Sequence, residues 1–129
     1  MKPEQFIREQ GEKKAREVVE DAPDGHKGYN DVINQYTRGV WFSRDVMLSD
    51  LKRLVESLNI VRVIGPIEYT RSVVTNAPVN AIGYDTMYEG YFGEETKHYY
   101  ENLRTFTIDQ IKDAVAAHES IYGGGDETN

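Results

Sequence analysis

Two stretches of this sequence resemble each other, and that internal similarity limits the folds open to the chain. Residues 12–31 align with residues 67–86 at an offset of 55, with seven identities in twenty positions. Average residue usage gives about one such identity by chance. Weaker matches continue at an offset of 54 upstream and 60 downstream, so the sequence predicts a unit of about 55 residues that occurs twice, with a longer middle in the second copy. The identical residues are Arg16 and Arg71, Val18-Val19 and Val73-Val74, Ala22-Pro23 and Ala77-Pro78, and Gly28-Tyr29 and Gly83-Tyr84.

The repeated unit begins with two helices. In the second copy Gly65 stands where a left-handed helix cap belongs, and Pro66 stands at a first helical position. The helix before Gly65 has Ser49 or Asp50 as its expected N-cap. Its apolar residues recur at spacings of three and four, which indicates one buried stripe. That stripe consists of Leu51, Leu54, Val55, Leu58 and Val61.

After its second helix, each copy is predicted to form a β-hairpin and then a closing helix. Pro23 and Pro78 end the second helix, because proline removes a donor and clashes with the preceding turn. The aromatic and β-branched residues that follow, interrupted by Gly, Asn and Asp, indicate a β-hairpin. A closing helix is predicted over residues 48–58 in the first copy and 108–118 in the second, where Thr107 is the expected N-cap.

These elements predict an α+β fold. We expect an internally duplicated helix–helix–β-hairpin–helix unit with pseudo-two-fold symmetry, and the hairpins joined in a small antiparallel sheet packed on helices. In an alternative arrangement, each copy is a separate helical pair with a protruding hairpin. Residues 1–122 form a single domain of two tandem repeats, about 5–58 and 59–120, and residues 123–129 form a flexible tail.

Composition excludes several classes of function. The 15 basic and 22 acidic residues give a net charge of −7, which argues against electrostatic binding of nucleic acid or anionic membrane. The chain has no cysteine, so disulfides and thiolate metal sites are excluded. No apolar segment is long enough for a membrane helix, and residues 1–14 lack the apolar core of a signal peptide. A cytoplasmic location is expected.

No pattern of catalytic residues stands out. His98 follows Glu94 and Glu95 at helical spacing, but no second such pair completes a metal site, and no nucleophile motif occurs. We therefore expect no enzyme activity, no catalytic or metal-ligating residues and no cofactor.

The acidic excess lies in the second half of the chain. Residues 1–64 contain 11 basic and 11 acidic residues, whereas residues 65–129 contain 4 and 11. Seven of the nine tyrosines are also there, and tyrosine is favoured at protein interfaces. Tyr84 and its counterpart Tyr29 are expected to be half-buried in the hairpins. The second half predicts a surface for a basic protein partner, made of Tyr88, Tyr91, Phe92, Glu94, Glu95, Tyr99 and Tyr100.

An alternative hypothesis uses the first half to bind nucleic acid, since aromatic stacking beside a few cations holds single strands even on an acidic protein. Trp41, the only tryptophan, is nevertheless expected to pack in the core more often than to anchor an interface. The candidate nucleic-acid surface consists of Arg38, Trp41, Arg44, Lys52 and Arg53.

The first half of the chain resembles a group of known proteins. Residues 4–9, 14–19 and 48–57, together with the Ala22-Pro23 pair, are similar to small early-region proteins of lambda-like phages and enteric prophages. The resemblance covers most of residues 4–58 and thins out in the second half. It implies a phage or prophage origin and a bacterial host cell, and it implies no mechanism.

The leading hypothesis is a non-catalytic interaction protein that binds a host protein through the acidic, tyrosine-rich second repeat. The alternatives are a nucleic-acid-binding module and, third, a small enzyme. The chain itself is expected to be a monomer or a homodimer, and duplication favours the monomer, because a repeated unit often stands in for two copies.

Overall fold

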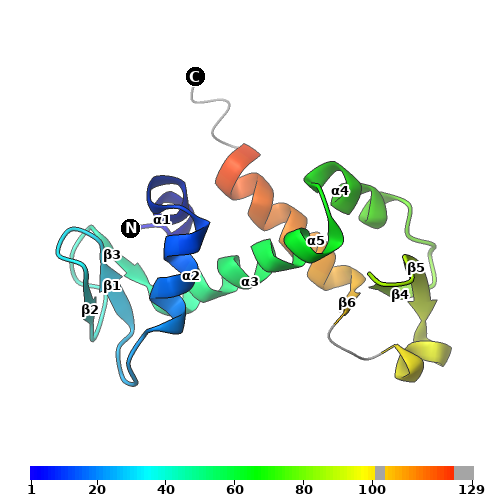
Figure 1. Ribbon diagram of the computed structural model, residues 1–129, viewed down its shortest axis with the longest axis horizontal. Coiled ribbons are helices and arrows are strands. Elements are labelled where there is room, and N and C mark those ends of the chain that lie inside the picture. Colours follow the sequence, from blue (N-terminus) through cyan, green and yellow to red (C-terminus); the bar gives the residue numbers. More distant parts are fainter. Residues whose placement is uncertain (101–103, 124–129) are drawn as a thin grey trace. The chain divides into compact units, whose positions relative to one another are not determined.

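The chain is an α+β protein, as the sequence predicts. A computed structural model describes residues 1–100 and 104–123 (Figure 1). The chain divides into two compact units, one made of Met1–Glu56 with Ser120–Asn129 and the other of Ser57–Glu119. We call them unit 1 and unit 2. The predicted tail, residues 123–129, lies outside the described residues except for Gly123.

Unit 1 combines two short helices with a small sheet. Its sheet has the strand order β2-β1-β3 and is antiparallel throughout, with Tyr29 of β1 opposite Tyr36 of β2 and Val46 of β3. The elements of unit 1 are α1 (Pro3–Gln10), α2 (Glu12–Glu20), β1 (Gly28–Asn30), β2 (Gln35–Thr37), β3 (Asp45–Met47), the first half of α3 (Leu48–Ile64) and most of the π-helical turn η2 (Glu119–Gly123).

Unit 2 has a sheet of the same kind. The order β5-β4-β6 again places the first strand in the middle, with Tyr84 of β4 opposite Tyr91 of β5 and Phe106 of β6. The elements of unit 2 are the second half of α3, α4 (Ile67–Thr75), β4 (Ala81–Asp85), β5 (Gly90–Gly93), the 3-10 helix η1 (Glu94–Tyr99), β6 (Thr105–Thr107) and α5 (Ile108–His118).

The sheets differ from the prediction in number and in size. The described residues form two separate three-stranded sheets rather than one sheet made from two hairpins. Each hairpin gains its third strand from the segment just before the next helix, β3 in unit 1 and β6 in unit 2. That strand supplies the support that a lone hairpin lacks.

The helix signals in the sequence are largely confirmed. Gly11 and Gly65 have φ angles of +92° and +142°, which favour glycine, and each separates two helices. Thr107 caps α5, because its hydroxyl accepts from the Gln110 amide while the Gln110 side chain accepts from the Thr107 amide. Helix α3 begins at Leu48, where the closing helix is predicted to start, but the expected N-cap at Ser49 or Asp50 is wrong, since both residues lie inside the helix, directly after β3. Pro66 is the N-cap of α4 rather than its first residue.

Each unit has its own buried core. In unit 1, Phe6, Ile7 and Leu51 are at most 1% exposed, and the ring of Phe6 meets Tyr29 edge-on at 6.0 Å. In unit 2, Val73, Tyr84, Ile108 and Ile111 form one buried cluster. Tyr29 and Tyr84 belong to the hairpin cores, as expected, but at 4% and 3% exposed they are buried rather than half-buried.

Arg8 fastens the end of the chain to unit 1. Its guanidinium Nη1 donates to the carbonyl oxygens of Ser120 and Ile121, at 2.9 and 3.0 Å. A cation at a helix C-terminus also stabilises the helix dipole. We expect Arg8→Ala to lower the free energy of the local opening of residues 119–123 by about 1 kcal/mol.

Amide hydrogen exchange of residues 119–123 measures this effect. Lys13→Ala, a change at an exposed position of α2, is the matched control and should leave the exchange rates unchanged. Equal protection in the Arg8→Ala variant and the wild type would show that Arg8 does not hold this segment.

Candidate functional site

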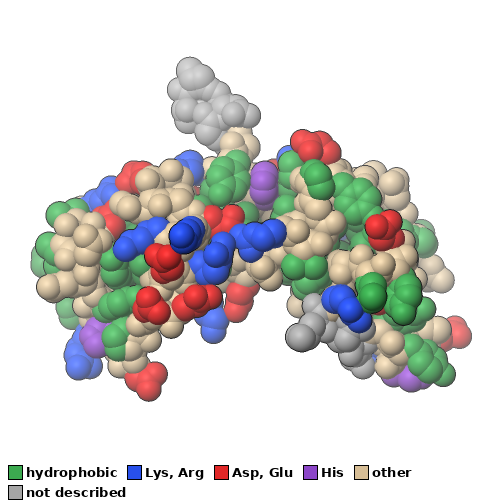
Figure 2. All heavy atoms as spheres, viewed as in Figure 1, with side chains coloured by type: hydrophobic (Ala, Val, Ile, Leu, Met, Phe, Trp, Pro, Cys, Tyr) green, Lys and Arg blue, Asp and Glu red, His purple; other side chains and the backbone are tan. Residues whose placement is uncertain are grey.

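Unit 1 exposes a group of large apolar side chains on the two turns of its sheet. Trp41 and Phe42 lie between β2 and β3 and are 69% and 68% exposed. Val32 and Ile33 lie between β1 and β2 and are 68% and 58% exposed, and Val40 is 41% exposed. We call these five residues the unit 1 tip. Figure 2 shows hydrophobic and uncharged surface at the left edge of the molecule, where Figure 1 places these strands.

A buried polar pair holds both turns of the unit 1 tip. Asn30 and Asp45 are cross-strand partners, and the Asn30 side-chain amide donates to the Asp45 carboxylate at 2.7 Å. Asn30 Oδ1 accepts from the backbone amides of Val32 and Ile33, at 2.9 and 3.3 Å. Both turns are thus attached to one point of the sheet.

The Asp45 carboxylate completes this arrangement. Its Oδ2 accepts from the amides of Trp41 and Phe42, each at 2.9 Å. Burial opposes ionisation of this carboxyl, but the hydrogen bonds from Phe42, Trp41 and Asn30 outweigh it, so the pKa of Asp45 lies below its ordinary value. The turn backbone is therefore held by an ionised acceptor, which makes stronger hydrogen bonds than a neutral one.

The expectation that Trp41 packs in the core is wrong. The hydrogen bonds to Asp45 fold the 41–45 backbone inward, while the Trp41 side chain stays largely in solvent. Gly39 gives the indole room, since a Cβ there would stand 2.9 Å from the ring. An asparagine side chain in a turn often accepts hydrogen bonds from the backbone amides that follow it. Asn30 is therefore a sequence signal that Val32 and Ile33 lie in a turn at the surface.

The structure divides the predicted partner surface of unit 2 into internal and external residues. Phe92 is 9% exposed; its ring lies over Gly83 and stacks on Tyr100 at 5.1 Å. The Tyr91 hydroxyl donates to the carbonyl oxygen of Val73 at 2.6 Å, and burial raises the pKa of Tyr91. Phe92 and Tyr91 therefore serve the fold of unit 2, and Tyr100 is half-buried against Phe92.

The external residues lie on η1 and on the β4–β5 turn. None of the six residues of η1 is buried. Glu94 and Glu95 begin it, and Tyr99 ends it, 74% exposed and with its ring 4.0 Å from that of His98. Glu94 makes an exposed ion pair with Lys97 at 2.8 Å. We call Glu94, Glu95 and Tyr99 the η1 surface. Tyr88, 75% exposed, lies apart from it in sequence, on the turn between β4 and β5.

The alternative nucleic-acid surface contains cations that are already paired. Arg44 binds Asp31 and also Glu9, the latter at 2.6 Å, and these bonds lower the pKa of both carboxyls. Arg53 pairs with Asp50 at 3.3 Å. Arg38 and Lys52 are exposed, and Arg38 lies on the same segment between strands as Trp41. Two of the four predicted cations, Arg44 and Arg53, are therefore already paired with carboxylates of the protein.

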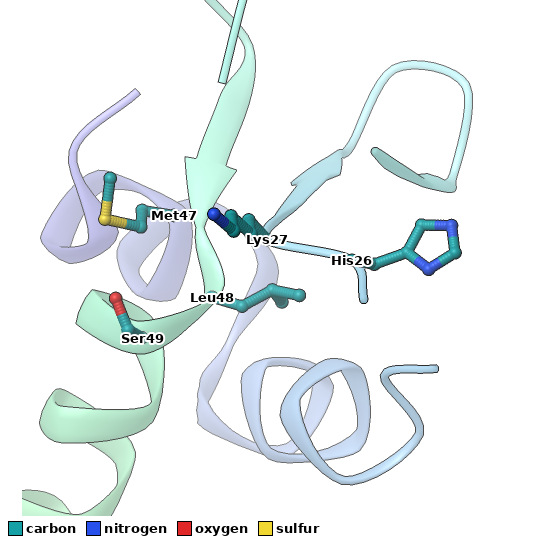
Figure 3. Close-up of a pocket in the computed structure, with 5 residues that line it drawn as sticks. All are labelled: His26, Lys27, Met47, Leu48 and Ser49. Carbon is teal, nitrogen blue, oxygen red and sulfur yellow. The ribbon is translucent and has the colours of Figure 1, made fainter. Parts of the chain in front are cut away.

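A pocket of about 300 Å³ opens beside the start of α3. It is lined by His26, Lys27, Met47, Leu48 and Ser49. Figure 3 shows the His26 ring directed away from Met47 and Ser49, so the Ser49 hydroxyl and the His26 imidazole lie on opposite sides. Nucleophilic catalysis needs these groups within hydrogen-bond reach, and this pocket does not bring them together.

Within residues 1–100 and 104–123, no three His, Asp or Glu side chains are grouped so that they could hold a metal ion. In the same part of the chain, no helix is both long and apolar enough to cross a membrane. No protein-family model, no curated protein and no solved structure matches this chain.

Proposed function

We propose that this chain is a non-catalytic interaction protein that binds a basic segment of another protein through the η1 surface. The observation that carries the proposal is that η1, six residues long, buries none of its side chains. A segment that adds nothing to a core is free to serve recognition. Its Tyr99 offers a large rigid contact with a polar end, as interface tyrosines do.

Charge supports a basic partner. Unit 2 carries 5 basic and 9 acidic residues between positions 57 and 119. Two of those acids, Glu94 and Glu95, are exposed next to each other at the start of η1. Complementary charge increases the association rate and suppresses wrong partners. The resemblance of residues 4–58 to phage and prophage proteins makes a protein of the bacterial host cytoplasm the natural candidate.

Charge reversal tests the proposal directly. The variant Glu94→Lys, Glu95→Lys, Tyr99→Ala removes the η1 surface and leaves Tyr91 and Phe92, which the fold needs. The control Glu20→Lys, Glu56→Lys makes the same change in net charge at two exposed positions of unit 1. We expect nuclease-treated enteric bacterial lysate to yield a protein that the wild type and the control retain, and that the η1 variant loses.

The outcomes separate the hypotheses. Equal retention of the same protein by the η1 variant and the wild type would contradict the proposal. Capture that disappears on nuclease treatment would instead favour binding to nucleic acid. In that case the captured material should be lost as the salt concentration rises.

We also infer that the two units arose by duplication of one unit, as the sequence predicts. Three structural correspondences at an offset of 55 support this inference. Asn30 and Asp85 each accept from the amides two and three residues later. Asn34 and Glu89 share φ angles of +53° and +55°. The hydroxyls of Tyr36 and Tyr91 donate to the carbonyl oxygens of Val18 and Val73, at 2.7 and 2.6 Å. Unit 2 differs by η1, which fits a later gain of a binding surface.

A further inference from the structure

We propose that a cavity of unit 1, between α2 and the β1–β2 hairpin, binds the primary ammonium group of a small amine or of a lysine side chain. The cavity has a volume of about 190 Å³. Its walls are built by α2, by the C-cap residue of that helix and by the hairpin. The site belongs to unit 1, so the proposal does not depend on the η1 surface.

Two carboxylates of this cavity lack a cation. Glu17 and Asp21 line the cavity, and both are exposed. They stand four residues apart, which makes them neighbours on one face of α2 and its C-cap. In residues 1–100 and 104–123, neither carboxylate has a hydrogen-bond or ion-pair partner. Like charges at this spacing repel each other, so an ammonium ion between them would remove a repulsion that the protein leaves uncompensated.

The end of α2 adds to the negative potential of the cavity. The C-terminal end of a helix carries a partial negative charge, which basic side chains in the last turn offset. The last turn of α2 contains no basic residue, and its C-cap is the acidic Asp21. The cavity itself is lined by one ammonium group, that of Lys14, against the carboxylates of Glu17 and Asp21. Its charge therefore selects a cation.

Two aromatic rings supply a further element of ammonium recognition. Tyr29 and Tyr36 line the cavity, and their rings meet edge-on with centroids 5.0 Å apart. The Tyr36 ring is fixed, because its hydroxyl donates to the Val18 carbonyl oxygen at 2.7 Å. Burial raises the pKa of Tyr36, and the nearby charge of Asp21 raises it further, so this carboxylate lies close to the ring. The Lys14 ammonium lies over the Tyr29 ring, 5.9 Å from its centroid, which is the contact that an organic ammonium ion makes with an aromatic face.

The fold does not require the charges of this cavity. At the sequence offset of 55, its apolar and aromatic wall positions recur in unit 2 as Val73, Tyr84 and Tyr91. The three charged positions do not recur, and unit 2 has in their place Tyr69, Ser72 and Asn76. The hydroxyls of Tyr69 and Tyr84 are hydrogen-bonded to each other at 2.6 Å. Unit 2 forms a sheet of the same kind without these charges, so in unit 1 they are free to serve binding.

Nuclear magnetic resonance of the full chain, labelled with ¹⁵N, tests the proposal with n-butylammonium as the probe. The backbone amides of residues 14–21 and 29–36 should shift on titration, and the dissociation constant should be about 1 mM for so small a ligand. n-Butanol has a similar shape and no charge, and it should bind at least tenfold more weakly.

Three variants locate the site, with circular dichroism establishing that each keeps the fold. Glu17→Gln, Asp21→Asn preserves the size of both side chains and should weaken the binding of n-butylammonium at least tenfold. The control Glu56→Gln, Asp24→Asn makes the same change in net charge at two exposed positions of unit 1 outside the cavity, and it should bind like the wild type. Lys14→Gln removes the positive charge from the cavity and should bind n-butylammonium more tightly.

A second probe distinguishes the two sources of the ammonium group. If Nα-acetyl-lysine N-methylamide binds as tightly as n-butylammonium, a lysine side chain of a protein fits the cavity. If it binds at least tenfold more weakly, the cavity serves a free amine.

Three results would overturn the proposal. The first is an absence of shifts in these amides at n-butylammonium concentrations up to about 50 mM, far above the expected dissociation constant. The second is an unchanged affinity in the Glu17→Gln, Asp21→Asn variant. The third is weaker binding by Lys14→Gln, which a site for a simple cation does not predict.

Discussion

Replacing Gly83 with alanine is expected to destabilise unit 2 by about 3 kcal/mol or more, because the new methyl group would occupy the space of a buried ring. A Cβ at Gly83 would stand 2.2 Å from Cζ of Phe92 and under 3 Å from two other ring carbons. Phe92 cannot move aside easily, since it is buried and Tyr100 stacks on it. Urea denaturation followed by circular dichroism measures the change in the free energy of unfolding.

Gly90 provides the control for this prediction. It lies in the neighbouring strand β5, and the nearest atom to an added Cβ is 3.9 Å away. Gly90→Ala should therefore change the stability by no more than about 0.5 kcal/mol. If the two variants unfold at the same urea concentration, the close approach of Phe92 to Gly83 is not a constraint on the fold.

The substitution Asp45→Ala is expected to lower the free energy of unfolding by about 3 kcal/mol. Asp45 is fully buried and accepts from the amides of Trp41 and Phe42 and from the side chain of Asn30. Alanine leaves these donors without their acceptor inside the protein. Asp24→Ala, at an exposed position in the loop before β1, is the control and should be nearly neutral.

The pH dependence of stability gives an independent test of Asp45. Its pKa in the folded protein lies below the ordinary value of 3.8, so the ionised carboxylate stabilises the fold above that pH. This contribution is lost as the pH falls from about 3.8 through the lower pKa of the folded state. The wild type should therefore lose more stability than Asp45→Ala over this interval. Parallel curves for the two proteins would contradict the assignment of Asp45 as an ionised acceptor.

The sequence was sufficient for elements with strong local signals. The glycines between helices, the Ala-Pro pairs and the Thr107 cap each act through the backbone of a few residues, so α1, α2, α4 and α5 could be expected. The third strand of each sheet could not be predicted from the sequence. β3 and β6 are three residues long, and they form because they pair with β1 and β4, a partnership between distant residues that no local pattern reveals.

The candidate surfaces show the same limit. Tyr91 and Phe92 are aromatic residues of the kind that is favoured at interfaces. In the structure, however, the Tyr91 hydroxyl bonds to Val73 and the Phe92 ring lies over Gly83, so both residues stabilise the fold of unit 2. Trp41 is a large apolar residue of the kind that usually packs in a core. The buried carboxylate of Asp45 nevertheless binds the Trp41 amide and holds this turn at the surface. In both cases, whether the side chain is buried or exposed depends on a contact with another residue, and a hydropathy pattern does not predict that contact.

The strands at the edges of the two sheets also bear on how this chain behaves at high concentration. β2 and β3 flank β1, and β5 and β6 flank β4, and each of these outer strands is only three or four residues long. Short edges offer few free backbone groups on which another chain could add a strand. A molecule with exposed aromatic side chains but such short edges can associate through those side chains without templating open-ended strand addition. The short edges therefore disfavour growth into fibres by strand addition.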